Sequence, residues 1–322
     1  MNIIILGAGA FGTAIGNSLA VNINNNVVIF STNKQKVDEI NTDNTNKSCF
    51  PNKQLTKRLT ATTNKKDIKN ADIVFVALPS TVVIEYLLSI RSFLKQDVLL
   101  VNLSKGIFSG GKTIVESMKK CLNVENVVTL KGPSFAVELL EHADTLLTLG
   151  YTTDIQRNMI SKIIKGTSIR VDFTTDIRGV ELLSVIKNIY AIFLGIVDAK
   201  YNSSNTRFMI LTKSFLEIRI ILLFLKGREE TLFSACGFGD FCLTSLNDLS
   251  RNRTLGLLIG KGFFNIEYKS NTVILEGLNS IRVLAKMLQG EHFLALPIFH
   301  KLDMFFKEGK KEFELNFDDL IK

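Results

Sequence analysis

The chain opens with Asn2-Ile3-Ile4-Ile5-Leu6-Gly7-Ala8-Gly9-Ala10-Phe11-Gly12, and this stretch predicts its fold. The apolar half predicts a strand, and residues 13–20 continue in a helical pattern. A G-x-G-x-x-G sequence between a strand and a helix is typical of dinucleotide binding. Gly7 permits a tight turn, Gly9 lets the backbone approach a pyrophosphate, and Gly12 lets the helix pack close to the strand. We therefore predict a dinucleotide site rather than an ordinary glycine turn.

The second predicted strand, residues 26–30, ends without an acidic residue. NAD-selective proteins usually carry Asp or Glu there, which accepts hydrogen bonds from the ribose hydroxyls. Here Ser31-Thr32-Asn33-Lys34 follows, with Lys36 beyond. Because no carboxylate would repel a 2′-phosphate, the sequence favours NADP(H), with NAD(H) also accepted. The alternative is that Lys34 and Lys36 are solvated charges at the start of a helix.

Length and composition indicate a two-domain globular protein. The chain has 322 residues, 46% of them hydrophobic, which is enough for two cores. Lys and Arg outnumber Asp and Glu by 39 to 31, yet the basic residues are scattered, so no nucleic-acid partner is expected. The four cysteines show no C-x-x-C spacing and there are three histidines, so we expect neither a zinc site nor a disulfide framework.

Nothing in the sequence predicts a signal peptide or a membrane span. The N-terminus lacks a charged segment ahead of its apolar run. Two apolar stretches, residues 71–90 and 208–225, contain charged side chains, which are costly inside a bilayer. We therefore expect both stretches to be buried elements of a cytoplasmic protein.

Apolar, strand-like runs alternate with helical patterns through the first half of the chain. They lie at residues 73–78, 98–103 and 127–130, with weaker runs at 145–149 and 168–171. Such alternation predicts a mostly parallel sheet covered on both faces, with the polar segment 41–48 as a surface loop. From residue 176 onward the patterns are helical. We thus predict a Rossmann-type α/β domain over residues 1–174, followed by an all-helical domain over residues 175–322.

Two polar segments follow predicted strands directly. Ligands bind outside the carboxyl ends of parallel strands, so such segments are candidate site residues. Ser104-Lys105-Gly106 follows the fourth strand, and Gly132-Pro133-Ser134-Phe135-Ala136 follows the fifth. Ser134 lies where a helix is expected to begin, so it could face an anion or serve as a plain N-cap.

Lys187 lies in a helical stretch, residues 182–197, that is apolar on nearly every side. Such a helix is buried, and lysine is rarely buried unless it is paired or functional. Small neighbours, Ser184 and Ala191, leave room for a ligand beside it. Burial is expected to lower the pKa of this lysine and to suit it for proton transfer near pH 7. The alternative is a side chain that reaches the surface at the edge of the helix.

Two later segments could complete a substrate pocket. Gly237-Phe238-Gly239-Asp240 places a carboxylate on a tight turn. Ser250-Arg251-Asn252-Arg253 combines guanidinium, amide and hydroxyl groups, which suits a phosphate. Alone, each could be a loop acid or a solvated basic turn. Beside a dinucleotide site, they indicate a pocket for an anionic substrate.

In this order, and together with Gly179-Val180-Glu181-Leu182, Ile186-Lys187-Asn188 and Glu276-Gly277, these motifs resemble the bacterial type of NAD(P)-dependent glycerol-3-phosphate dehydrogenase. The resemblance covers almost the whole chain. It implies reversible hydride transfer between sn-glycerol 3-phosphate and dihydroxyacetone phosphate, which supplies phospholipid synthesis. It also implies a helical second domain and a homodimer.

The same resemblance assigns roles to single residues. Lys187 would be the general acid/base at the C2 oxygen, with Lys105 and Asp240 as further catalytic-site residues. The implied substrate positions are Lys105, Gly132, Ser134, Lys187, Asp240, Ser250, Arg251 and Asn252. The implied cofactor positions are Gly7, Gly9, Ala10, Phe11, Gly12, Thr32, Lys105, Ala136, Arg251, Ile274 and Glu276.

The chain departs from the family pattern in one region. Thr206-Arg207-Phe208-Met209 stands where Ala-Arg-Thr-Ala is usual, and Lys213-Ser214 stands where Arg-Gly is usual. The bulk of Phe208 and Met209 predicts altered packing, and Lys213 keeps the charge but loses the guanidinium fork. These departures leave open a catalytically impaired NAD(P)-binding regulatory homologue. A second alternative, a related dehydrogenase of the 3-hydroxyacid or 6-phosphogluconate type, stays open because its lysine and asparagine chemistry is similar.

Overall fold

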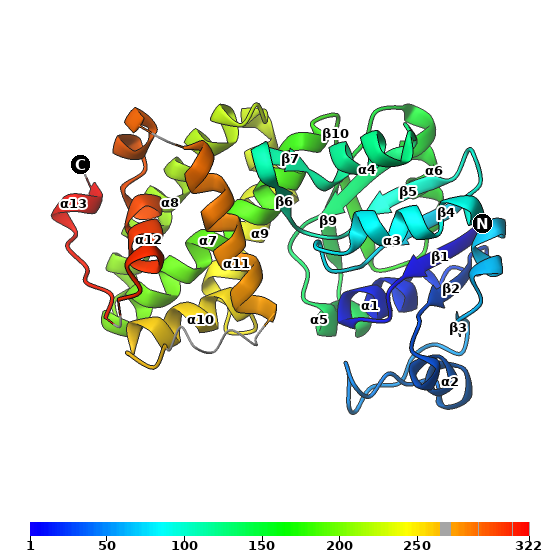
Figure 1. Cartoon of the computed structure of the whole chain (residues 1–322). Helices are drawn as coiled ribbons and strands as arrows, with labels where there is room; N and C mark the ends of the chain where they lie inside the picture. Colours follow the sequence, from blue (N-terminus) through cyan, green and yellow to red (C-terminus); the bar gives the residue numbers. More distant parts are fainter. Residues whose placement is uncertain (265–271, 289, 311, 322) are drawn as a thin grey trace. The chain divides into compact units, whose positions relative to one another are not determined.

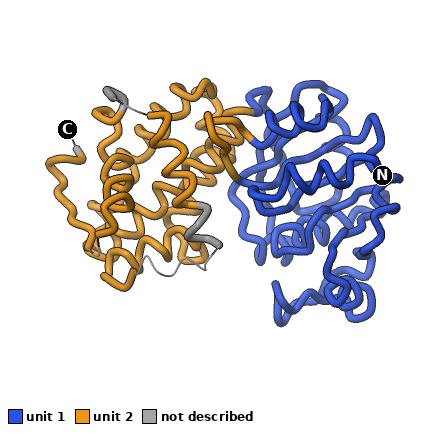
Figure 2. Tube along the Cα trace, viewed as in Figure 1, with its two compact units in different colours: residues 1–105, 114–177 blue, residues 106–113, 178–322 orange. Residues whose placement is uncertain are grey.

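The computed structural model divides the chain into two units, each with its own hydrophobic core. Unit 1 comprises Met1–Lys105 and Ile114–Ile177, and unit 2 comprises Gly106–Thr113 and Arg178–Lys322 (Figure 2). The structure describes residues 1–264, 272–288, 290–310 and 312–321. This division departs from the predicted boundary at residues 174/175 by a few residues and by the excursion of 106–113 into unit 2.

Unit 1 is a Rossmann-type α/β unit built on an eight-stranded sheet (Figure 1). The strand order is β10-β9-β8-β5-β4-β1-β2-β3, and every pairing is parallel except the antiparallel one between β8 and β9. The predicted mostly parallel sheet is therefore confirmed. The strands are β1 (Asn2–Leu6), β2 (Asn26–Phe30), β3 (Leu59–Thr62), β4 (Ile73–Val76), β5 (Leu99–Asn102), β8 (Val127–Lys131), β9 (Thr145–Gly150) and β10 (Ile169–Thr174).

Helices cover both faces of this sheet. Successive residues of a strand point to opposite faces, and all residues of β4, β5 and β8 are buried, so neither face of the central sheet is exposed there. Local signals start some helices; the Thr153 and Gln156 side chains, for example, form a capping box at the start of α6. The helices are α1 (Ala10–Leu19), α2 (Lys34–Asp43), η1 (Lys65–Asn70), α3 (Val83–Ser89), η2 (Arg91–Phe93), α4 (Ile114–Leu122), α5 (Ala136–Leu140) and α6 (Asp154–Ile164).

The polar segment 41–48 lies mostly at the surface, as its composition predicts, but it is only partly loop and includes two buried residues, Thr45 and Asn46. Helix α2 extends to Asp43, and the chain then turns inward. Asn46 is fully buried and donates hydrogen bonds to the Ala8 carbonyl oxygen at 3.1 Å and the Thr13 hydroxyl at 2.9 Å. The buried Asn46 amide takes the place of water as the hydrogen-bonding partner of these two groups, so this segment helps to hold the glycine loop.

Unit 2 is helical, as predicted, apart from the short hairpin contributed by residues 106–113. Its elements are β6 (Ile107–Phe108), η3 (Ser109–Gly111), β7 (Lys112–Thr113), α7 (Ile177–Lys200), α8 (Ser204–Phe224), η4 (Glu229–Phe233), the π-helical turn η5 (Ala235–Gly239), α9 (Asp240–Leu246), α10 (Arg251–Gly260), α11 (Thr272–Met287), η6 (Gly290–Ala295), α12 (Pro297–Glu308) and α13 (Asp318–Ile321). Helix α7 is long and apolar enough to cross a membrane, but 94% of its most apolar window is buried inside the protein, where it forms the centre of the unit 2 core.

Two glycines bring α10 close against α7. A Cβ atom built on Gly256 would overlap the carbonyl oxygen of Ile192, and one on Gly195 would overlap that of Arg253. Only glycine permits this backbone approach. The crossing fixes the start of α10, where the Ser250-Arg251-Asn252-Arg253 motif lies, relative to the helix that carries Lys187.

Candidate active site

The glycine loop after β1 is tightly packed at Gly7 and Gly12 and is open at Gly9. Gly7 has φ +112°, and a Cβ atom there would lie 2.6 Å from the Ala77 carbonyl oxygen. A Cβ on Gly12 would overlap the carbonyl oxygen of Gly7, so the helix can pack this closely only without a side chain. A Cβ on Gly9, by contrast, would meet nothing within 4 Å. The open side of the loop therefore offers backbone to a ligand, as the motif predicts.

The start of α1 suits an anion. Gly9 is its N-cap residue, and among the described residues no side chain caps this end and no acidic residue lies in its first turn. The positive end of the helix dipole is thus left to a ligand. Lys36 adds charge nearby, since its ammonium donates to the Ala8 carbonyl oxygen at 3.4 Å. Ala10 and Thr32 are exposed, and a dinucleotide fits these groups.

Lys36 is therefore more than a solvated charge. It is partly buried, and its side chain lies against the glycine loop. Lys34 is exposed at the start of α2, where Asn33 serves as N-cap. The alternative interpretation of solvated charges fits Lys34 but fails for Lys36.

The turn Ser104-Lys105-Gly106 is held by a polar network at the ends of β4, β5 and β8. The Ser104 backbone N–H donates to Asn102 Oδ1 at 3.0 Å, and the Ser104 hydroxyl donates to the Leu78 carbonyl oxygen at 2.6 Å. Lys131, which is 2% exposed, donates to the carbonyl oxygens of Ser104 at 2.7 Å and Asn102 at 3.0 Å. Lys105 follows this fixed turn and is partly exposed.

The segment after β8 differs in detail from its prediction. The Ser134 hydroxyl donates to the Gly132 carbonyl oxygen at 3.1 Å. Helix α5 begins only at Ala136, with Phe135 as an N-cap residue that makes no side-chain capping bond, so the plain N-cap interpretation of Ser134 is wrong. Gly132 has φ +156°, and a Cβ there would lie 2.9 Å from the Leu146 carbonyl oxygen, so this residue also lets β9 approach.

Lys187 is buried in the middle of α7. It is 4% exposed, which excludes the alternative that its side chain reaches the surface. Its ammonium forms an ion pair with Asp240 and donates to the Thr244 hydroxyl at 2.7 Å. The Asp240 side chain is 2% exposed, so both charges of the pair are removed from water. A buried ion pair in this form needs precise geometry and orients the ammonium.

Thr244 contacts Lys187, and it was not singled out from the sequence. Asp240 is the first residue of α9, directly after the π-helical turn η5, and Thr244 follows it by four residues. Residues four apart share one face of a helix, so this spacing was the available signal. The two side chains contact Lys187 from the same face of α9.

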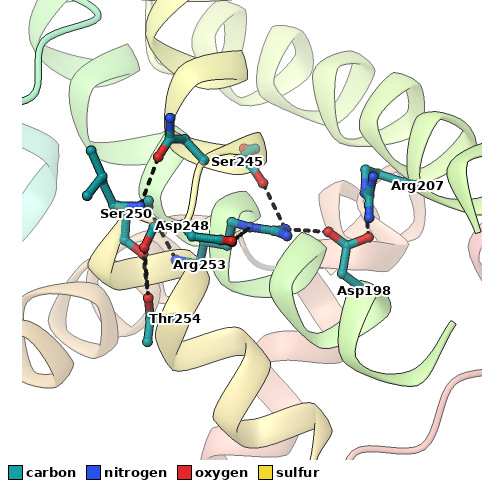
Figure 3. A network of polar contacts seen from close by, with 9 residues as sticks. Asp198, Arg207, Ser245, Asp248, Ser250, Arg253 and Thr254 are labelled. Carbon is teal, nitrogen blue, oxygen red and sulfur yellow. Dashed lines mark hydrogen bonds and ion pairs between the residues drawn. The ribbon is translucent and has the colours of Figure 1, made fainter. Parts of the chain in front are cut away.

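The Ser250-Arg251-Asn252-Arg253 motif divides into structural and accessible residues (Figure 3). Ser250 is buried and caps α10 by accepting from the Arg253 backbone N–H at 3.3 Å. The Arg253 side chain forms ion pairs with Asp198 and Asp248 and donates to the Ser245 carbonyl oxygen at 3.2 Å. Arg251 is exposed and Asn252 is half-buried, so these two remain accessible to a ligand at the helix start.

The charge of Arg253 is stabilised in place. Burial lowers its pKa, but hydrogen bonds to Asp198 and Asp248 outweigh this effect and raise the pKa overall. Arg207 contacts Asp198 from the other side, with Nε 2.6 Å from Oδ1 (Figure 3). The neighbouring Phe208 is 54% exposed, so its bulk lies outside the core, whereas Met209 packs partly buried against the hydrophobic cluster of unit 2.

Some expected site residues are only partly described. Ile274 and Glu276 belong to the first turns of α11, and their side chains lie outside the described residues. A Cβ on Gly277 would lie 3.5 Å from Asn252 Oδ1, which places the backbone of α11 beside the start of α10. Within the described ranges, no group of three or more His, Cys, Asp or Glu side chains could hold a metal ion.

Comparisons with known proteins match the chain over nearly its full length. Residues 2–156 match the family described as the N-terminus of NAD-dependent glycerol-3-phosphate dehydrogenase, and residues 176–315 match its C-terminus. A glycerol-3-phosphate dehydrogenase [NAD(P)+] of Methanothermobacter thermautotrophicus is 34% identical, covering 92% of this chain and 91% of its own. One of Clostridium botulinum is 30% identical, covering 98% and 96%. The crystal structure of glycerol-3-phosphate dehydrogenase from Coxiella burnetii aligns with TM-score 0.86 at 27% identity, covering 96% of this chain and 95% of its own.

Proposed function

The chain belongs to the NAD-dependent glycerol-3-phosphate dehydrogenase family. We propose that unit 1 binds the dinucleotide and that Lys187 of unit 2 donates and accepts the proton of the reaction. The protein is an NAD(P)-dependent oxidoreductase that interconverts sn-glycerol 3-phosphate and dihydroxyacetone phosphate. The observation that carries the assignment of the proton is the buried cluster of Lys187, Asp240 and Thr244. A match over both halves of the chain does not favour the 3-hydroxyacid or 6-phosphogluconate alternative.

The dinucleotide would be held by the glycine loop and the start of α1. Gly7 and Gly12 shape the loop, and Gly9 leaves its backbone accessible to the pyrophosphate. The further cofactor positions in this proposal are Ala10, Phe11, Thr32, Lys105, Ala136, Arg251, Ile274 and Glu276. When bound, the nicotinamide ring supplies or accepts the hydride at C2 of the substrate.

Lys187 would give a proton to the C2 oxygen in the direction of reduction and take it back in the direction of oxidation. Asp240 holds the ammonium by an ion pair, and Thr244 accepts one of its hydrogen bonds. Because the pair is buried, the ammonium has a fixed direction, which general acid/base catalysis requires.

Arg251 and Asn252 would bind the substrate phosphate. They are the first two residues of α10, whose N-terminus attracts anions, and the Arg251 fork matches phosphate geometry. Ser250 would contribute by capping this helix as well as by its place near the substrate. Lys105, Gly132 and Ser134 complete the proposed substrate positions in unit 1.

NADP(H) is the favoured cofactor in this proposal, with NAD(H) accepted. No carboxylate ends β2, where the ribose 2′ position is expected, and Lys36 lies in the first turn of α2 just beyond that strand, so a 2′-phosphate would gain from its charge. We expect a higher kcat/KM for NADPH than for NADH. Thr32→Glu should move this ratio toward NADH by about tenfold, because an exposed repulsion is screened by solvent and salt.

Initial rates of dihydroxyacetone phosphate reduction, measured separately with NADPH and NADH, test this preference. Thr60→Glu is a matched control, since Thr60 is exposed on β3 of the same unit. A ratio of kcat/KM for NADPH and NADH that is the same in wild type and Thr32→Glu would contradict the expected shift. The same assay addresses the impaired regulatory homologue, which would bind NADPH without oxidising it.

The wider setting is also part of the proposal. An enzyme with this substrate pair would supply glycerol 3-phosphate for phospholipid synthesis in the cytoplasm. We expect a homodimer, as the family resemblance implies, and no nucleic-acid partner.

A further inference from the structure

A second buried lysine, Lys131, lies in unit 1 and has no role in the reaction described so far. It is the last residue of β8 and is 2% exposed. Lysine is rarely buried without a specific function, because taking an ammonium out of water is costly. The position of Lys131 therefore requires an explanation of its own.

The ammonium of Lys131 joins two segments that precede proposed site residues. It donates to the carbonyl oxygens of Asn102 at 3.0 Å and Ser104 at 2.7 Å. Ser104 immediately precedes Lys105. Lys131 itself immediately precedes Gly132, so one side chain connects the turn after β5 with the turn after β8.

The turn that Lys131 contacts is also held by neutral partners. Asn102 Nδ2 donates to the Ser104 carbonyl oxygen at 3.1 Å, and the Thr129 hydroxyl donates to that of Asn102 at 3.3 Å. Neither carbonyl would lose its last partner if Lys131 were replaced. The fold can therefore survive the substitution, while the turn loses its two charge-assisted bonds, which are the stronger kind.

We propose that Lys131 is a positioning residue, which fixes the Ser104-Lys105-Gly106 turn and so sets the direction of Lys105 toward the substrate. The proposal rests on the substrate role of Lys105 in the proposed function. Small displacements of a positioned group are costly, since a misplacement of about 1 Å can cost about 10²-fold in rate. A buried lysine at this point restrains the turn through its two carbonyl contacts.

The test is a double-mutant cycle on kcat/KM for dihydroxyacetone phosphate, with wild type, Lys131→Met, Lys105→Ala and the double variant. Lys131→Met alone should lower kcat/KM by about tenfold or more. The Kd for NADPH should change much less, because Lys105 is one of many proposed cofactor positions and the glycine loop is untouched. In the Lys105→Ala background it should have almost no further effect, because residues that act as a unit are not additive. If the Lys105→Ala variants turn over too slowly, the cycle uses the Kd of glycerol 3-phosphate for the enzyme–NADPH complex, which cannot react.

Hydrogen exchange gives a readout that is independent of activity. Lys131→Met should speed amide exchange in peptides covering residues 103–108 and leave α6 unchanged. Lys119→Met is the matched control: Lys119 lies on α4 of the same unit, pairs with Glu125 at 3.1 Å, and should affect neither readout.

The outcomes separate the two proposals. Wild-type kinetics in Lys105→Ala would remove the substrate role of Lys105 and so the proposed function of that residue. A slow Lys105→Ala with wild-type kinetics and exchange in Lys131→Met would overturn the positioning role of Lys131. An equal loss from Lys131→Met with and without Lys105 would also overturn it.

Discussion

The burial of Lys187 was predictable from the sequence because the helix around it is apolar on nearly every side. The structure adds what makes such a residue tolerable, namely the ion pair with Asp240 and the bond to Thr244. Removing one partner of a buried pair leaves the other charge uncompensated, so the pair is expected to behave as a unit.

Lys187→Met should reduce kcat by about 10²-fold or more, the usual loss when a general acid or base is removed. NADPH binding should be nearly unchanged, because Lys187 is not among the proposed cofactor positions. Stopped-flow turnover and fluorescence titration of NADPH measure the two effects. Lys200→Met, at the exposed end of the same helix, is the control. A variant at position 187 that keeps near-native kcat would exclude the proton-transfer role.

The same substitution, to Lys, should weaken substrate binding at Arg251 and lower stability at Arg253. Arg251→Lys should raise KM for dihydroxyacetone phosphate by about tenfold through loss of the bidentate fork, with little change in the thermal midpoint. Arg253→Lys should lower the thermal midpoint, since the Arg253 side chain links Asp198, Asp248 and the Ser245 carbonyl. Steady-state kinetics and thermal unfolding of both variants test the contrast. A pure stability loss at Arg251 would place the phosphate elsewhere.

The partners of several buried polar residues were not predictable one residue at a time. Lys131 and Asn46 are polar residues in segments whose role depends on partners 27 and 38 residues away, at Ser104 and Ala8. Ser250 and Arg253 belong to a motif that suggests ligand binding, yet they stabilise the helix start. Side-chain chemistry indicates what a residue can do, but the choice between ligand and internal partner depends on tertiary packing.

At the scale of elements, Glu217 shows how α8 holds α12. Glu217 is 4% exposed and accepts hydrogen bonds from the backbone N–H groups of Ile298 at 2.7 Å and Phe299 at 3.0 Å, in the first turn of α12. The Tyr190 hydroxyl of α7 donates to it at 2.8 Å. Burial raises the pKa of Glu217 to about 7, against the opposite effect of these three hydrogen bonds.

The free energy of unfolding should therefore fall as pH rises from about 4.5 to about 7 on account of Glu217. In this window the unfolded chain releases the proton while the folded protein retains it, so the contribution is complete below 4.5 and is lost as pH passes the folded pKa. The size is on the order of 3 kcal/mol. Urea unfolding from pH 4.5 to 8 measures it. Glu217→Gln should flatten this part of the profile, and an unchanged slope in that variant would contradict the assignment.

Strands with an apolar run were predicted, including the weaker runs that became β9 and β10, whereas the short strands without such a run were missed. The apolar runs that became β4, β5 and β8 are buried on both faces, so their composition was sufficient. Strand β3 alternates buried with more exposed residues at the edge of the sheet, and its four residues resemble a loop. The hairpin strands β6 and β7 have two residues each, too few for any periodicity.

At the scale of the whole molecule, the order of motifs along the chain predicted the two-unit plan and the family. The path of the chain between the units was not predictable. Residues 106–113 lie between two segments of unit 1 but belong to unit 2, where the Arg178 side chain donates to the Gly111 carbonyl oxygen at 3.1 Å. A partner 67 residues away leaves no local signal.

This excursion means that the molecule cannot be dissected by one cut. A fragment that starts at Arg178 would lack residues 106–113, so the Met287 side chain would lose its contact with Gly111. This contact is so close that a Cβ atom on residue 111 would overlap the Met287 side chain. A fragment that ends at Ile177 would carry the same eight residues without the rest of unit 2, to which they belong. During synthesis, residues 106–113 leave the ribosome before any other part of unit 2 exists, so that unit completes its fold only by recruiting a segment made much earlier.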